Sequence, residues 1–424
     1  MNLVFFILIL VSFTTAAWQQ LRWAGDGVAP MEALSAAMVD SAAGSVELAL
    51  GLVGVMSLFL GLMKVAEAGG LLTIIARLIR PLMVRLFPAV PADHPAMGAM
   101  ILNLSANALG LGNAATPFGI RAMQELERLN PRPGTATDAM VLFLAINTSS
   151  VTLLPTGVIA LRAAAGSGDP AGILPTTLFA TFCATAAAII ATFAYRRFFA
   201  LPVGRETVEP ASISTHEGLP DVASESYPFW VSMLALGSLL GLIPLSVLYG
   251  QFVAPWILPG LMLAFLSFGL LRQVRIYEVF VEGAKEGFQV ALRIIPYLVA
   301  ILVAVGMLRA SGALEAVINL LAPWTGAVGL PAEALPMALL RPLSGSGAYA
   351  VLASIINDPD IGSDSYTGYL VSTLQGSTET TFYVLAVYFG AVQVKRIRHA
   401  LLAALTADVV AVFAAVFACT YFLS

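Results

Sequence analysis

Two clusters of hydroxyl, carboxamide and charged side chains interrupt an otherwise apolar chain, each at the mouth of a hydrophobic segment. Hydroxyls and carboxamides can form directional hydrogen bonds to a solute that has lost its water. These residue types predict a binding site for a small polar solute, with no catalytic residues and no metal site. The first cluster contains Asn147, Thr148, Ser149, Ser150 and Thr152, and the second contains Gln375, Ser377, Thr378, Glu379, Thr380 and Thr381.

Two further stretches, 95–119 and 336–350, are apolar but too short or too rich in Gly, Asn and Pro to be ordinary membrane spans. Non-helical backbone at membrane depth is tolerated only where protein or a water-filled cavity satisfies its amides. The stretches therefore predict re-entrant or discontinuous helices, whose exposed N-termini attract polar or anionic groups. Their candidate binding residues are Asn103, Ser105, Asn107, Asn113 and Thr116 in one stretch, and Arg341, Ser344 and Ser346 in the other.

Close helix packing is the competing explanation for these small polar residues, since their hydrogen bonds between membrane helices contribute only roughly 0.6–2 kcal/mol. For any single Ser or Thr, packing is the better explanation. The two clusters taken together favour a site, because broken segments in corresponding positions of two halves point to the same place.

Two acids lie within or beside apolar spans, where an ionisable group is a functional hypothesis by default. Glu379 has Arg341 as its natural partner, so it either binds substrate or a cation, or forms a structural ion bridge. Asp408 lies in the middle of 401–423 and either relays a proton or pairs with Arg293.

Composition places the chain in a membrane. Of 424 residues, 59% are hydrophobic and 11% charged, with a mean hydropathy of +0.88, whereas a soluble domain has roughly 25% charged residues. The net charge of −4 gives no reason to expect nucleic-acid binding. Walker A, HExxH and GxSxG motifs are absent, so we expect neither an enzyme nor a cofactor. The partners that these features predict are the lipid bilayer and a small polar solute, and a homo-oligomer is compatible with them.

The elements needed to position these residues are helical spans of about 20 residues. Residues 3–17 form a short apolar run without a basic n-region, which favours a retained span over a cleaved signal. Two amphipathic segments, 30–44 and 274–289, predict interfacial helices in the membrane plane. The clear spans are 45–63, 139–163, 173–195, 228–248, 252–271, 293–307, 380–394 and 401–423.

The chain also repeats itself around one soluble stretch, 201–226, which reads as a flexible linker. Each half has an amphipathic segment, a span, a short helix, a broken segment and a polar cluster in the same order. We therefore predict an all-α integral membrane protein of two pseudo-symmetric halves with broken or re-entrant helices, divided as 1–200, 201–226 and 227–424.

The distribution of Lys and Arg predicts that the halves are inverted. Basic residues collect early in the first half, between 64 and 132, and late in the second, at Lys395, Arg396 and Arg398. Since basic loops stay in the cytoplasm, matching parts lie on opposite sides of the membrane. This places the N-terminus and the linker in the cytoplasm of a bacterial inner-membrane protein.

Residues 103–119 (NLSANALGLGNAATPFG), with 61–70 (GLMKVAEAGG) before them, closely resemble the spore maturation protein A family. Residues 281–288 (VEGAKEGF), 341–348 (RPLSGSGA) and 375–390 (QGSTETTFYVLAVYFG) resemble the spore maturation protein B family. The resemblance covers nearly the whole chain apart from the linker, so the chain looks like a fusion of the two proteins. It implies the gate or nucleoside-recognition domain, which concentrative nucleoside transporters and the ferrous iron transporter B also carry. A helical membrane fold and transport-like behaviour follow from this resemblance, without a particular substrate.

Transport or permeation of a small polar solute is therefore the expected function. The alternatives are a non-transporting membrane scaffold affecting the cell envelope or spore maturation, and a membrane enzyme with Glu379 as its acid or base. The first two differ in whether the polar clusters line a solvent-reachable cavity or pack dry against each other.

Overall fold

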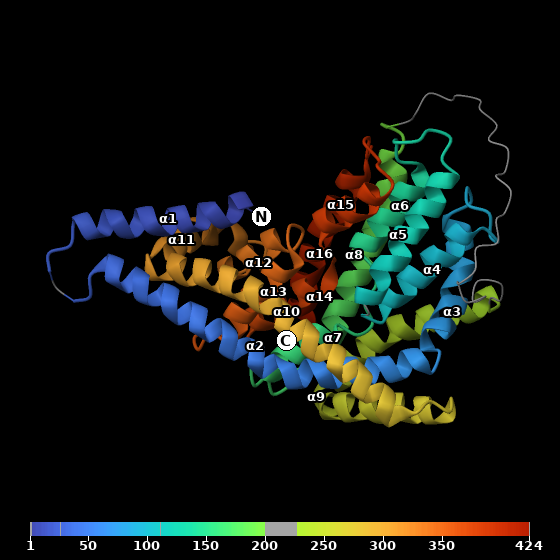
Figure 1. The fold of residues 1–424 in the computed structure, drawn as a ribbon, viewed down its shortest axis with the longest axis horizontal. Helices are drawn as coiled ribbons and strands as arrows, with labels where there is room; N and C mark the ends of the chain where they lie inside the picture. The colour runs from blue at the N-terminus through green and yellow to red at the C-terminus, as the bar shows by residue number, and fades with distance from the viewer. Residues whose placement is uncertain (1, 26, 111, 200–226, 424) are drawn as a thin grey trace.

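The computed structural model describes residues 2–25, 27–110, 112–199 and 227–423, and within them it is helical without a β-strand (Figure 1). The predicted linker 201–226 lies outside the described residues. The first half contains α1 (Asn2–Leu21), α2 (Pro30–Ala68), α3 (Leu71–Leu86), α4 (Pro95–Ala108), α5 (Gly112–Arg128), α6 (Asp138–Thr148), α7 (Thr156–Ala164) and α8 (Leu174–Tyr195). The second contains α9 (Phe229–Leu271), α10 (Ile276–Ala310), α11 (Ala313–Gly326), the 3₁₀ turn η2 (Ala332–Ala334), α12 (Leu335–Leu340), α13 (Gly345–Ile356), α14 (Tyr366–Ser377), α15 (Thr381–Ala391) and α16 (Ala400–Phe422).

Among the described residues, two helices are long and apolar enough to cross a membrane unbroken: α8 with 22 residues and α16 with 23. They confirm the predicted spans 173–195 and 401–423. The last part of α2 and the whole of α3 meet the same criterion only when they are taken together as one broken span. They bend by 68° at the break between them. Together with the composition, these helices make the protein an all-α integral membrane protein.

α8 and α16 pack antiparallel in the middle of the molecule (Figure 1). The hydroxyl of Tyr195, at the end of α8, lies 3.0 Å from that of Thr406 near the start of α16. At the other end the rings of Phe179 and Phe417 stack 5.6 Å apart. Both helices bury alanines at intervals of three to four residues, and such small residues let membrane helices approach closely.

The long helices α2 and α10 form a second antiparallel pair. Glycines of α10 meet the backbone of α2: a Cβ at Gly283 would lie 2.6 Å from the carbonyl oxygen of Leu60, and one at Gly287 would lie 2.6 Å from the Cα of Ser57. The two glycines are four residues apart and so lie on one face of the helix. This spacing is the Gly-x-x-x-Gly pattern that brings membrane helices into contact.

The predicted amphipathic segments 30–44 and 274–289 are not separate interfacial helices. They are largely the first turns of α2 and α10, which continue into the apolar stretches without a break. Each helix stays continuous because α2 and α10 pack against each other along their length.

The predicted spans 228–248 and 252–271 form the single helix α9, which continues through residues 249–251. A straight helix of 43 residues would be about 65 Å long. However, the start of α9 lies against α3, where Arg85 stacks on the ring of Phe229, and the residue after its end, Arg272, donates to the carbonyl of Gly69. α3 has 16 residues and is about 24 Å long. The two ends of α9 thus lie near the two ends of α3, much closer together than about 65 Å, so the helix bends between them.

The predicted span 139–163 is split into α6 and α7 by residues 149–155. Pro155 disfavours helix for the residue before it and so sets the start of α7. Likewise, 380–394 is only the 11-residue α15, about 16 Å long and roughly half a bilayer core. It continues from α14 across the three residues Thr378, Glu379 and Thr380. The helices therefore break at the polar clusters as well as in the predicted stretches.

The stretches 95–119 and 336–350 are interrupted helices, as predicted. α4 and α5 form a hairpin that turns after α4 at Leu109 and Gly110, where Gly110 has a φ of +74°. Glycine adopts this left-handed conformation without a Cβ penalty. In the second half, α12 and α13 are joined by a turn at Arg341–Ser344.

The two largest apolar cores among the described residues each combine both halves of the chain. One surrounds α7 with α13, α14 and α16 of the second half. The other surrounds α15 with α4, α5 and α6 of the first half. Each half therefore inserts its last short helix into the core of the other, and the two halves interlock.

Candidate functional site

The two broken helices, α6–α7 and α14–α15, lie antiparallel with their breaks side by side. The backbone amide of Glu379 donates to the carbonyl of Thr148 at 2.8 Å, which joins one break to the other. On one side of this contact Phe143 of α6 stacks on Tyr388 of α15, with ring centroids 6.1 Å apart. On the other, Arg162 of α7 donates to the hydroxyl of Ser372 in α14 at 3.4 Å. The two polar clusters therefore lie opposite each other in the structure, as predicted.

The asparagines of the first half form a dry network around Tyr388. The Asn103 amide donates to the Tyr388 hydroxyl at 3.1 Å and to the carbonyl of Ala115 at 2.8 Å. The Asn147 carbonyl accepts from the Asn107 amide at 2.9 Å and from the Tyr388 hydroxyl at 3.3 Å. Asn103 and Asn147 are buried, so this network holds α4, α6 and α15 together.

The first-half hydroxyls mostly bond to their own helices. Ser105 donates to the carbonyl of Ile101, and Thr148 and Ser149 both donate to that of Ala145. Such bonds use the one donor of each hydroxyl, so it has no O–H left to donate to a solute. The Ser150 hydroxyl is buried and has no partner among the described residues.

The remaining first-half candidates lie on α5. Thr116 is half-buried there, and the side chain of Asn113 lies outside the described part of the chain.

A cavity of about 160 Å³ lies beside the paired breaks. Residues 152–158 of the first half form one wall, and Gln375, Gly376, Glu379 and Thr380 form another. The N-terminal end of α13 and Tyr349 complete it. Three of the six residues of the second-half cluster thus line the cavity, whereas Thr152 is the one member of the first-half cluster that does so.

Arg341 holds the break between α14 and α15 in place. Its guanidinium donates to the hydroxyl of Thr380 at 3.2 Å and to the carbonyl of Thr378, and it lies 3.7 Å from the carboxylate of Glu379. The arginine side chain is 7% exposed and that of Glu379 is 48% exposed. The predicted ion bridge is therefore present, and it leaves the carboxylate open towards the cavity.

The other candidate binding residues of the second half lie either in the cavity wall or within or at the ends of helices. Gln375 is buried in the cavity wall, and its side-chain oxygen has no partner within the described structure. Ser344 caps α13 by accepting from the amide of Gly347, and Ser377 donates to the carbonyl of Leu374. Ser346 is half-buried in α13.

Asp408 lies behind the second break. Its carboxylate accepts a hydrogen bond of 2.7 Å from Thr381, the first residue of α15. One carboxylate oxygen is buried with no partner among the described residues. The side chain of Arg293, its predicted partner, lies outside the described residues.

Arg162 is a structural residue that is not among the candidates predicted from sequence. It is fully buried, and it donates to the carbonyl of Ser363 at 2.6 Å and to the carboxylate of Asp364 at 3.0 Å. Its guanidinium also stacks on Tyr369, 4.1 Å from the ring centre. In the loop beyond α7, burial raises the pKa of Asp169, and the nearby Arg162 opposes this. A charge within an apolar helix was the signal that could have identified Arg162.

A matching contact lies at the opposite end of the broken helices. Arg398, after α15, donates to the carboxylate of Asp138 at 2.6 Å and to the carbonyl of Ala136 at 3.2 Å. Arg162 lies in the last turn of α7 and Arg398 lies beyond the end of α15. Each arginine binds the segment at the start of the first half-helix of the other half. The two contacts therefore have the same design at opposite ends.

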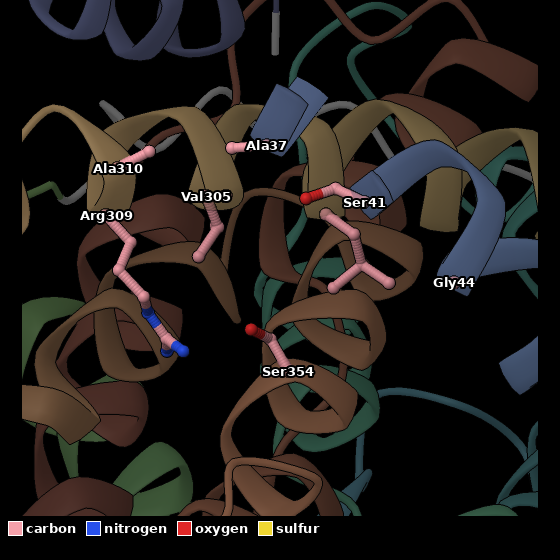
Figure 2. Close-up of a pocket in the computed structure, with 9 residues that line it drawn as sticks. Ala37, Ser41, Gly44, Val305, Arg309, Ala310 and Ser354 are labelled. Atoms are coloured by element: carbon pink, nitrogen blue, oxygen red, sulfur yellow. The ribbon is translucent and has the colours of Figure 1, made fainter. Parts of the chain in front are cut away.

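A second cavity, of about 380 Å³, lies between α2, α10 and α13 (Figure 2). Its polar side chains are Ser41, Arg309 and Ser354, and Arg309 also pairs with Asp358 at 2.8 Å. None of the predicted site residues lines it, and the broken helices do not end there. The cavity beside the breaks is therefore the candidate site.

Comparison with known proteins agrees with this architecture. The family model "Gate: Nucleoside recognition" matches residues 49–165 and 291–395, which together make up about half of the chain. The chain belongs to the Gate family. Spore maturation protein B of Bacillus subtilis (strain 168) is 46% identical over 159 residues, covering 38% of this chain and 88% of that protein. Spore maturation protein A of the same organism is 45% identical over 169 residues, covering 39% of this chain and 86% of that protein. No solved structure matches.

The two Gate segments contain the same kinds of elements in the same order. Each begins within a long helix, α2 or α10, and extends to the second half-helix of a broken pair, α7 or α15. All residues of the candidate cavity lie within the two segments. The spanning helices α8 and α16, with Asp408, lie outside them.

Proposed function

We propose that this Gate protein moves a small polar solute across the membrane through the site between its broken helices. The observation that carries the proposal is the antiparallel pairing of α6–α7 with α14–α15, with their breaks joined beside a polar cavity. Broken helices with their ends at membrane depth are the usual binding elements of secondary transporters. Membrane proteins use such irregular backbone only where it is buried or lines a cavity.

The same geometry supports an inverted repeat. The equivalent pairs α2 with α10, α8 with α16 and α6–α7 with α14–α15 all run antiparallel. A two-fold axis in the membrane plane relates equivalent helices in this way. The Arg162 and Arg398 contacts at opposite ends obey the same relation.

The substrate that fits is small and rich in hydrogen-bond donors. The cavity of about 160 Å³ is smaller than the roughly 300–1,000 Å³ of ordinary ligand pockets. The open carboxylate of Glu379 and the unpartnered oxygen of Gln375 both accept hydrogen bonds. A nucleoside, suggested by the family description, is one candidate that would donate to them.

The location and chemistry follow from the same proposal. The protein lies in the bacterial inner membrane with its N-terminus and basic loops in the cytoplasm. It acts without catalysis, and Glu379 and Asp408 are the groups that would couple transport to a proton or cation.

A ligand panel on the purified protein tests the site. Nucleosides, dicarboxylates, amino acids and cell-wall fragments are added separately, and unfolding temperature is measured, since a ligand bound only to the folded state raises stability. We expect one solute class to raise the unfolding temperature, and Glu379→Gln to abolish that shift. Glu315→Gln, an exposed acid of α11, is the matched control and keeps it. A shift that persists in Glu379→Gln would place the site elsewhere.

A non-transporting scaffold is the second candidate, favoured by the dry asparagine network around Tyr388. Solvent access separates the two functions. In a chain with both cysteines replaced by alanine, Thr152→Cys lines the cavity and Ser105→Cys is buried. For a transporter, a water-soluble maleimide labels only Thr152→Cys. Labelling of neither cysteine would favour the scaffold.

A further inference from the structure

A third cavity, of about 850 Å³, opens at the end of the molecule where α6 begins and α8 ends. The loop 129–139 forms one side, and the end of α8 forms another. It is separate from the candidate transport site, which lies at the helix breaks. Neither the sequence motifs nor the proposed function uses it.

The charges around this cavity are unbalanced. Among the described residues that line it, Arg196, Arg197 and Arg398 face the single carboxylate of Asp138, and Arg132, which has a partner of its own, lies beside them. That carboxylate accepts from Arg398 at 2.6 Å and from Arg196 at 3.1 Å. One acid is thus shared by two arginines, and the cavity keeps an excess of positive charge that an anion would neutralise.

The cavity is well suited to planar anion recognition. Guanidinium groups bind phosphate oxygens with two parallel hydrogen bonds, and so bind more strongly than a point charge. The N-terminus of α6, with Thr137 as its cap, also borders the cavity and adds a partial positive charge. Arg398 is 8% exposed and is held by the carbonyl of Ala136, so one donor is rigidly placed.

One rim of the cavity is apolar and faces outwards. Phe193 lines the cavity and is 45% exposed, and Ile190, one turn earlier on α8, is 68% exposed. α8 is one of the two unbroken spanning helices, so these side chains lie on its lipid-facing surface. From Ile190 to the end of α8 at Tyr195 the helix rises about 8 Å, and Arg196 and Arg197 follow directly. An acyl chain along α8 would therefore place its phosphate among the arginines.

We propose that this cavity is a specific binding site for the headgroup of an anionic phospholipid. Basic pockets between membrane helices bind anionic headgroups by this combination of charge and apolar surface. The lipid would join the loop 129–139 to the end of α8 and share Arg196 with Asp138. This site does not depend on the proposed transport function.

The test compares two double variants of the full-length protein in detergent. Arg196→Gln with Arg197→Gln removes two exposed charges at the cavity, while Arg275→Gln with Lys285→Gln removes two exposed charges elsewhere. Native mass spectrometry counts bound phosphatidylglycerol and phosphatidylethanolamine. We expect the wild type and the control to retain one phosphatidylglycerol in preference to phosphatidylethanolamine. The cavity variant should bind phosphatidylglycerol roughly thirtyfold more weakly.

Further measurements exclude the other outcomes. Equal unfolding temperatures of the two lipid-free double variants would show that both are folded. A third double variant, Arg196→Lys with Arg197→Lys, keeps the charge and should bind phosphatidylglycerol more strongly than the Gln variant. Equal phosphatidylglycerol binding by the cavity variant and the control would overturn the site. Inorganic phosphate that displaces the lipid and stabilises the protein equally would overturn the lipid as the occupant and leave a soluble anion.

Discussion

Arg341 shows how a single buried charge maintains a break in a membrane helix. The carbonyl of Thr378 has no helical partner, and in a membrane an unsatisfied backbone group costs several kcal/mol. The guanidinium supplies that partner and also binds the hydroxyl of Thr380. The break is therefore maintained by the arginine, and the carboxylate of Glu379 is positioned at its edge.

Replacement of Arg341 by alanine should destabilise the protein by about 2–3 kcal/mol, because it removes two hydrogen bonds from a charged donor in a buried place. Glu379→Gln should cost less than about 1 kcal/mol, since half-exposed ion pairs contribute little. Unfolding of both variants in mild detergent measures the difference. Similar losses in the two variants would mean that the ion pair, and not the backbone contact, maintains the break.

As Arg341 holds the second-half break in place, Tyr388 holds the buried asparagine network together. It joins Asn103 of α4 to Asn147 of α6. A double-mutant cycle of Tyr388→Phe and Asn147→Ala should give a coupling energy of about 0.6–1.7 kcal/mol, the range for hydrogen bonds between membrane helices. The measurement is the unfolding free energy of the two single variants and the double variant. Additive effects would show that the hydroxyl and the amide do not interact.

At the scale of elements, close packing of α2 with α10 depends on the absence of side chains at two positions of α10. Gly283 and Gly287 lie against the backbone of α2, which cannot move aside as a flexible side chain would. The pairing brings the starts of the two halves together. It therefore orients the remaining elements of one half relative to the other.

Gly287→Ala should destabilise the protein by about 1–3 kcal/mol, because the added methyl group overpacks the contact with Ser57. The matched control is Gly260→Ala on α9, where a Cβ meets open space. The control should be neutral or more stable by up to about 1 kcal/mol, through helix propensity alone. Equal stability of the two variants would show that α2 and α10 do not pack closely in the membrane.

At the scale of the whole molecule, the exchange of α7 and α15 between the halves makes each core dependent on both. Arg162 and Arg398 close this arrangement at its two ends. An inverted repeat requires these two ends to lie on opposite sides of the membrane. The loops next to them are exposed and can be labelled.

Single cysteines in a cysteine-free chain test this topology. Pro133→Cys lies in the basic loop before α6, and Gly168→Cys lies in the loop after α7. In intact cells an impermeant thiol reagent should label Gly168→Cys, and it should label Pro133→Cys only after lysis. Labelling of both positions from the same side would contradict the inverted topology.

Membrane location, the helical class, the order of elements in two halves and the positions of the interrupted segments could be predicted from sequence. Each depends on local properties: apolar length decides whether a helix can span, and a run of Gly, Pro and hydroxyl residues decides where it cannot continue. Span limits were less predictable. Residues 139–163 are apolar enough for one helix, yet Pro155 and the preceding hydroxyl residues divide them.

The sequence by itself determined that polar side chains of both halves would lie beside helix breaks in a membrane, because bilayer and backbone constraints act locally. Only the tertiary structure decided which of them face a cavity. Ser149 and Thr380 have similar hydroxyl groups, yet one bonds to its own helix and the other binds Arg341 at the cavity. Two partners of Arg162, Ser363 and Asp364, lie about 200 residues away along the chain. Such contacts depend on how distant helices pack, which no local pattern of residues specifies.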